Sequence, residues 1–128
     1  MRAALPLALF MTGCATMPSG QAHLAPVRIA LAPESVEQRL LSGPPQTAGM
    51  RSGRVVLAPG AAMHRHSTEE NEEVLLFLQG QVRVVLGSEP LVMEAGQVLY
   101  IPPQTEHELH NEGAEEARYI YLVAPVRR

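Results

Sequence analysis

The rhythm of short apolar runs in the second half of the chain constrains the fold more than any other feature. From Arg54 onward, runs rich in Val, Leu, Ile and Tyr are separated by Pro, Gly and Glu about every eight to twelve residues. Short segments with turn signals at this interval are typical of antiparallel sandwiches and small barrels. We therefore predict an all-β fold.

Eight strands are predicted in this region, and one of them has an unusual pattern. The predicted strands span residues 54–58, 63–66, 73–78, 81–86, 91–93, 97–101, 106–110 and 118–123. Alternation along the third strand places Glu73, Leu75 and Phe77 on one face. Because residues 74–78 are all apolar, we expect both faces of this strand to be covered, which favours a homodimer. Gln79-Gly80 predicts a two-residue hairpin after it.

The 128 residues have the length of one domain, and the region before the barrel has its own pattern. Residues 27–31 form a short apolar run that predicts a first strand. Within 33–41, apolar residues at 36, 40 and 41 have helical spacing and predict a short helix. We therefore expect residues 27–53 to pack as a strand and a short helix on a barrel formed by residues 54–125.

The first fourteen residues have the layout of a secretory signal. One Arg is followed by an apolar run and then by small residues before Cys14, the only cysteine. The run is shorter than the roughly 20 residues of a membrane-spanning helix. Met11-Thr12-Gly13-Cys14 resembles the lipobox of bacterial lipoproteins, which implies lipid attachment at Cys14.

The segment after Cys14 favours an anchor rather than a folded element. It has no apolar periodicity and contains Pro18-Ser19-Gly20, as a flexible tether would. We predict a signal peptide at 1–13, a tether at 14–26, and a lipoprotein on the periplasmic side of the cell envelope. The alternative is that the apolar run belongs to the fold and that the protein is cytoplasmic.

Composition excludes several kinds of chemistry. All ten basic residues are Arg and all thirteen acidic residues are Glu, so lysine Schiff bases and aspartate nucleophiles are excluded. A net charge of -3 and 4% aromatic residues leave no basic, stacking surface for nucleic acid. Chemistry is left to Glu, His, Cys, Tyr or a bound ion.

Three histidines and a group of glutamates form a candidate metal site. His64 and His66 are two apart in a predicted strand, so both imidazoles are expected on one face. His107 begins another strand beyond a Pro-rich turn. Imidazole and carboxylate together suit Mn, Fe, Ni, Cu and Zn. The candidate carboxylates between His66 and the apolar strand are Glu69, Glu70, Glu72 and Glu73.

These residues resemble the two motifs of the cupins, in particular the small conserved-barrel cupins. The first motif is a Gly, a His-x-His pair, a Glu, six residues and a Gly, and it is met by Gly60, His64, His66, Glu73 and Gly80. The second motif is met by Gly96, Pro102, His107 and Asn111. Gln104 stands where the family commonly has Gly.

The first motif also departs from the family in its spacing. Gly60 precedes His64 by fewer residues than usual, and the interval from His66 to Glu73 is longer by about two. The motif selects Glu73 as the carboxylate ligand, while the longer interval leaves Glu70 and Glu72 as alternatives.

The resemblance implies a jelly-roll barrel that holds one divalent metal ion (Fe, Mn, Ni, Cu or Zn) through His64, His66, Glu73 and His107. We expect a metal-dependent enzyme of the dioxygenase type that acts on a small oxygenated substrate. The alternative is a non-enzymatic module that binds metal or a small ligand. A ligand-sensing regulator is not favoured, since no helix-turn-helix pattern accompanies the barrel.

Overall fold

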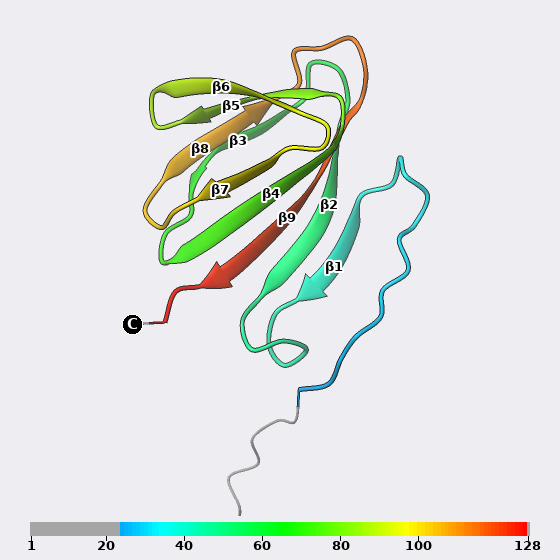
Figure 1. Ribbon diagram of the computed structural model, residues 1–128, viewed down its shortest axis with the longest axis vertical. Helices are drawn as coiled ribbons and strands as arrows, with labels where there is room; N and C mark the ends of the chain where they lie inside the picture. Colours follow the sequence, from blue (N-terminus) through cyan, green and yellow to red (C-terminus); the bar gives the residue numbers. More distant parts are fainter. Residues whose placement is uncertain (1–23, 128) are drawn as a thin grey trace, which may run out of the picture.

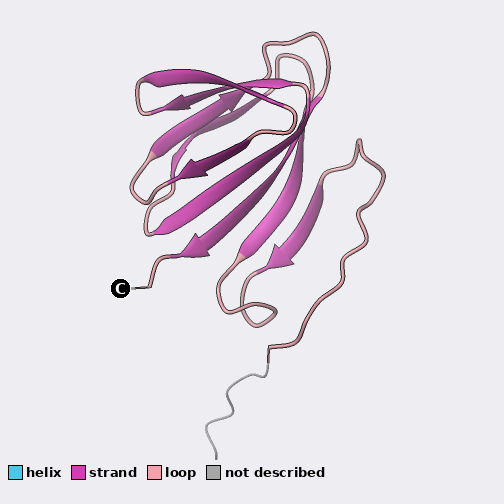
Figure 2. Cartoon of the chain, viewed as in Figure 1, coloured by secondary structure: helices cyan, strands magenta, loops and turns pink. Residues whose placement is uncertain are grey.

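The computed structural model describes residues 24–127, and all the regular secondary structure in this part of the chain is β-strand (Figure 2). The all-β prediction is confirmed. The predicted signal peptide, most of the tether and Cys14 lie outside the described residues. Among residues 24–127 there is no helix of the length and apolarity that crossing a membrane requires.

Within residues 24–127, nine strands form two antiparallel sheets that face each other (Figure 1). The strands are β1 (Gln38–Ser42), β2 (Arg51–Leu57), β3 (Ala62–Ser67), β4 (Asn71–Gln79), β5 (Gln81–Leu86), β6 (Glu89–Glu94), β7 (Val98–Ile101), β8 (Glu106–His110) and β9 (Ala117–Pro125). One sheet has the order β1-β2-β9-β4-β7 and the other β3-β8-β5-β6. Each of the eight predicted strands corresponds to one of β2 to β9.

The core lies between the sheets and is formed by one face of β2 and of each strand from β4 to β9. It consists of Val55, Leu57, Leu75, Phe77, Val82, Val84, Met93, Ile101, Leu109, Ala117 and Tyr119. Along β4, Glu73, Leu75 and Phe77 are buried, whereas the residues between them are only half-buried. This alternation confirms the predicted inner face of β4. Burial of each large side chain contributes about 1.5–3 kcal/mol.

The predicted hairpin at Gln79-Gly80 is wrong, because β4 and β5 belong to different sheets. The chain turns a corner between the two layers here, and Gly80 adopts a φ of 74°. A Cβ at this position would lie 2.9 Å from the carbonyl oxygen of Glu116. The glycine is required both by the left-handed backbone and by the close approach of β9.

The predicted strand at 27–31 and the predicted helix at 33–41 are also wrong. Residues 24–32 have no regular structure, and a turn with a hydrogen bond from Val36 N to Pro33 O (3.0 Å) leads into β1. A helix of so few residues is marginal by itself, whereas β1 gains backbone pairing with β2. Of the apolar residues at helical spacing, Leu40 and Leu41 therefore lie on an edge strand and Val36 lies in the turn before it.

A buried arginine holds the N-terminal segment against the barrel. The side chain of Arg54 is only 4% exposed. Its guanidinium donates hydrogen bonds to the carbonyl oxygens of Ala32, Pro33 and Val36 at 2.8–3.1 Å. This segment is thus attached through a side chain rather than through sheet pairing.

Candidate metal centre

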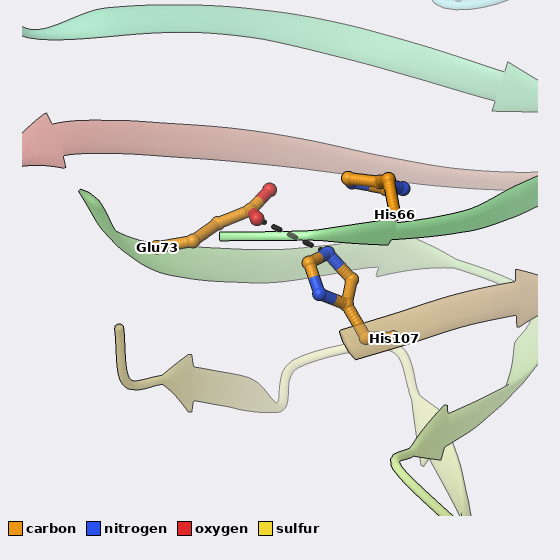
Figure 3. Close-up of side chains that lie close together, drawn as sticks. All are labelled: His66, Glu73 and His107. Atoms are coloured by element: carbon orange, nitrogen blue, oxygen red, sulfur yellow. Dashed lines mark ion pairs between the residues drawn. The ribbon is translucent and has the colours of Figure 1, made fainter. Parts of the chain in front are cut away.

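Three of the four predicted ligands meet between the two sheets (Figure 3). Glu73 comes from β4 in the five-stranded sheet, whereas His66 and His107 come from β3 and β8 in the other sheet. Their ligand atoms all lie within 4.8 Å of one another. Glu73 and His107 are buried, while His66 is exposed. The group therefore lies at the boundary between core and solvent and could hold a metal ion.

His64 lies outside this group because of a bulge in β3. Met63 pairs with Leu109 and His66 pairs with His107, so two residues of β3 lie opposite the single residue Glu108. Such a bulge breaks the two-residue alternation. The expectation that His64 and His66 share a face is therefore wrong, and the structure brings only His66 to the group. His64 as a metal ligand stays a prediction.

Both histidines of the group are oriented by backbone carbonyls. Nδ1 of His66 lies 2.8 Å from the carbonyl oxygen of His64, and Nδ1 of His107 lies 3.1 Å from that of Thr105. We assign the Nδ1 proton to each ring on this basis, since a carbonyl can only accept. Each Nε2 is then available as a ligand atom, which is the usual arrangement of metal-binding histidines.

An ion-pair contact joins His107 and Glu73 within the group. Nε2 of His107 lies 3.2 Å from a carboxylate oxygen of Glu73. Burial lowers the pKa of His107, but its hydrogen bonds to Glu73 and Thr105 and the charge of Glu73 raise it, and the net pKa is raised. In the metal-free protein a proton is therefore favoured between these two groups.

The same contact fits a metal ion in place of the proton. Neighbouring ligands on an octahedral ion with bonds of about 2.1 Å lie roughly 3 Å apart. The separation of 3.2 Å between Nε2 of His107 and the oxygen of Glu73 agrees with this value. Two imidazoles and one carboxylate suit the divalent metals Fe, Mn, Ni, Cu and Zn, and do not distinguish among them.

A protein-family model that matches more than half of the chain identifies its family. A model described as the cupin domain matches residues 53–123. The chain belongs to the cupin family. The match covers β3 to β8, all three residues of the candidate metal group, and most of β2 and β9.

This cupin also resembles two curated Streptomyces proteins. It is 34% identical over 85 residues to the polyketide synthase CurC of Streptomyces cyaneus and 33% identical over 85 residues to protein SchB of Streptomyces halstedii. Each match covers 64% of this chain, but only 55% of CurC and 62% of SchB. The cupin thus spans little more than half of the length of these relatives.

Solved structures support the fold. A cupin 2 conserved barrel domain protein from Salinispora arenicola has a TM-score of 0.67 at 21% identity, over 80% of this chain and 92% of that one. A cupin protein from Bacteroides fragilis also has a TM-score of 0.67, at 19% identity, over 78% of this chain and 84% of that one. At these identities the similarity establishes the jelly-roll barrel alone.

The unusual spacing of the first cupin motif agrees with the geometry of the group. If the His-x-His pair is placed two residues later, at His66 and Thr68, the interval after Gly60 lengthens by two and the interval before Glu73 shortens by two. Both departures from the family then disappear. In this placement Thr68 stands where the second histidine of the pair would stand, so spacing was the signal that favoured His66 over His64.

Thr68 has a structural role at this position. It is buried, and its hydroxyl donates to the carbonyl oxygen of Pro102 (2.8 Å) and accepts from the amide of Thr105 (3.0 Å). It therefore links the end of β3 to the turn before β8. In that turn Gln104 has a φ of 57°, which explains why glycine is common there.

The alternative carboxylates do not join the metal group. The side chain of Glu72 accepts a hydrogen bond from the hydroxyl of Tyr100 at 3.0 Å. Glu70 is exposed and follows the end of β3. Of the three candidates, the structure brings only Glu73 to the two histidines.

A cavity of about 380 Å³ opens beside the metal group. Its apolar side includes Met63, Leu75, Leu109 and Val123, and its polar side includes Tyr119, Tyr121, Arg39 and Arg51. Burial, followed by the charges of Glu73, Glu37 and Tyr121, raises the pKa of the Tyr119 hydroxyl, which therefore stays protonated. The sequence does not point to the two arginines, because residues 27–53 predict a strand and a short helix that pack outside the barrel.

Proposed function

We propose that this cupin is a metal-dependent enzyme that performs dioxygenase-type chemistry on a small oxygenated substrate. The observation that carries the proposal is the set of two histidines and one glutamate beside an open cavity. Three protein ligands leave three positions on an octahedral ion, and this ligand set is typical of non-haem iron oxygenases. A bound metal would supply an electrophilic centre for oxygen and for substrate oxygen atoms.

The residues of the chain have separate tasks in this proposal. The carbonyl oxygens of His64 and Thr105 hold the two imidazoles in one tautomer. The apolar side of the cavity excludes water from the substrate. Tyr119, which keeps its proton, donates a hydrogen bond to a substrate oxygen.

The name of one relative supports an oxygenated substrate. The name of CurC refers to a polyketide synthase, and polyketides carry several carbonyl or hydroxyl oxygens along one carbon chain. A molecule of that type would present neighbouring oxygen atoms to the metal group. The shared region covers only part of CurC, so the name supports the class of substrate and nothing narrower.

Metal analysis of two neighbouring histidine variants tests the site. We expect about one divalent metal per purified chain. His66→Ala should lose most of it, because Nε2 of His66 is a ligand atom. His64→Ala should keep it, because only the backbone carbonyl of His64 contacts the group. Loss of metal in His64→Ala would instead support the four-ligand set with His64.

Oxygen consumption distinguishes an enzyme from a binding module. The binding module is favoured by one observation: Glu73 is the only carboxylate among the described residues that line the cavity, so no second carboxylate accompanies the metal group as an acid or base. We expect oxygen uptake with catechols, flavonols or acidic diketones after reconstitution with Fe, Mn, Ni or Cu. If the protein binds these ligands but consumes no oxygen with any of the four metals, the non-enzymatic binding module is favoured.

We also propose a location at the cell envelope, on the periplasmic side, through lipid attached to Cys14. The support is the sequence Met11-Thr12-Gly13-Cys14 after a short apolar run. Mass spectrometry of protein from a native host should find the lipid on an N-terminal cysteine. An intact, unmodified Met1 would refute the anchor and favour the cytoplasmic alternative.

A homodimer is proposed from the outer face of the five-stranded sheet. Leu78, Val98 and Tyr100 are 46%, 61% and 53% exposed there. Contact with a second copy would cover these side chains. Light scattering after size-exclusion chromatography should give twice the mass of the chain, and a monomer at all concentrations would refute the dimer.

A further inference from the structure

Two arginines line the same cavity as the metal group. Arg39 comes from β1 and Arg51 from β2, which lie at the opposite edge of the five-stranded sheet from β7. Both side chains are exposed. The cavity therefore has a cationic region as well as the metal group.

Sheet register places Arg51 at the same level as Glu73. Arg51 pairs with Val123 on β9, and Val123 pairs with Glu73 on β4. Directly paired residues point to the same face of a sheet, and all three line the cavity. Since adjacent strands are about 4.8 Å apart, the backbones of Arg51 and Glu73 are separated by roughly 10 Å.

Arg39 belongs to the next set of paired residues across the sheet, two positions along β2 from Arg51, and this set includes a tyrosine. It pairs with Gly53, which pairs with Tyr121. A Cβ at Gly53 would lie 2.8 Å from the hydroxyl oxygen of Tyr121, so the Tyr121 ring extends over Gly53 toward β1. The glycine thus leaves space for a third hydrogen-bond donor next to the two arginines.

Neither arginine has an ion-pair partner among the residues that the structure describes. The other arginines of the barrel strands have partners: Arg54 binds backbone carbonyls, Arg65 and Arg83 pair with glutamates, and Arg118 pairs with Glu34 and Glu116. Within residues 24–127, Arg39 and Arg51 form no ion pair and donate no side-chain hydrogen bond. Positive charge in a cavity without a partner attracts anions.

We propose that Arg39 and Arg51, with the hydroxyl of Tyr121, bind a carboxylate of the substrate. Another part of the same molecule carries the oxygen atoms that meet the metal group. Guanidinium groups match carboxylates in geometry and charge. The distance between the arginines and the metal group suits a molecule about one aromatic ring in length. This inference rests on the proposed function and narrows its substrate to an oxygenated carboxylic acid.

A matched pair of ligands tests the inference without turnover. The probes are 3,4-dihydroxybenzoate and its methyl ester, which share two neighbouring oxygens but differ in charge. Calorimetric titration uses the full chain, both metal-free and loaded with Zn²⁺, which is not redox-active. We expect the acid to bind about tenfold more tightly than the ester to both forms.

Arginine variants identify the source of the preference. Arg39→Gln combined with Arg51→Gln should remove the preference for the acid and leave the Zn²⁺ content unchanged. Arg83→Gln is the matched control, since Arg83 pairs with Glu112 and does not line the cavity; it should keep the preference. Because Arg39 and Arg51 are both exposed, the double variant should fold like the wild type.

The two proposals fail in different ways. If Zn²⁺ tightens binding of both probes but wild type does not prefer the acid, the carboxylate site is refuted and the metal site stands. If the acid is preferred but Zn²⁺ tightens neither probe, the metal-held substrate is refuted and the carboxylate site stands. A preference that persists in the double variant refutes the assignment to Arg39 and Arg51.

Discussion

At the scale of single residues, the metal group depends on how two imidazoles are held. Each Nδ1 faces the carbonyl oxygen two residues earlier in the chain. A ring fixed in this way loses little freedom when its other nitrogen binds a metal. In the structure His64 contacts the group through its backbone carbonyl, and its side chain lies outside the group.

The raised pKa of His107 predicts how the stability of the metal-free protein depends on pH. The unfolded pKa is about 6.5 and the folded value is higher, so the native state holds the proton more tightly. The resulting stabilisation is complete below about pH 6.5 and is lost as pH rises through the folded pKa. Urea denaturation between about pH 5 and pH 9 should show this decrease.

Glu73→Gln is the control for this pH dependence. It removes the charge that favours the protonated imidazole while preserving the shape of the side chain. The decrease in unfolding free energy above about pH 6.5 should be smaller in this variant. An identical profile in wild type and variant would mean that another group is responsible.

A hydroxyl that touches no ligand atom is expected to tune the site. Thr68→Val removes the hydrogen bonds to Pro102 O and Thr105 N, which are partly buried, and should cost about 0.5–1.5 kcal/mol for each bond. Because the carbonyl of Thr105 orients His107, metal affinity should fall as well. Thr68→Ser, which keeps the hydroxyl, should retain most of both. Urea denaturation and metal titration measure the two effects.

At the scale of elements, the corner between β4 and β5 is a demanding position. Gly80→Ala would place a Cβ near the backbone of Glu116 and Ala117 in a left-handed conformation. Gly87 also has a positive φ, but nothing lies within 4 Å of its added Cβ. We expect Gly87→Ala to cost about 1–2 kcal/mol and Gly80→Ala clearly more. Equal costs in urea denaturation would contradict the close approach.

Strands that contribute to the core could be predicted from the sequence, whereas β1, at one edge of the five-stranded sheet, could not. β4 has an inner face of Glu73, Leu75 and Phe77 that alternation reveals. β1 has no such pattern, since it includes the inward Arg39 and a register irregularity before Leu41. Its pairing with β2 depends on a tertiary neighbour rather than on its own residues.

The same difference explains which parts of the site could be predicted. His66, Glu73 and His107 belong to spaced motifs, so the sequence identifies them. The exclusion of His64 from the group follows from a bulge, which two-residue alternation cannot foresee. The arginines of the cavity were missed because they meet the metal group only through the order of strands in the sheet.

At the scale of the whole molecule, a metal ion would connect the two sheets, because Glu73 belongs to one layer and the histidines to the other. Binding only to the folded state raises the unfolding free energy, by about 2.7 kcal/mol at a free metal concentration one hundred times Kd. Thermal unfolding with and without Zn²⁺ should show a higher Tm with metal. His66→Ala should show no such shift, and an equal shift in the variant would point to binding elsewhere.

The pairing of His66 with His107 also determines when the site can exist during folding. These strands are far apart in the sequence, and the sheet that carries Glu73 requires the last strand, β9, beside β4. Contacts of such long range are slow to form, because closing long loops costs entropy. A growing chain on the ribosome therefore has no assembled site until the last strand has been made, and a metal ion would bind to this site only in the folded barrel.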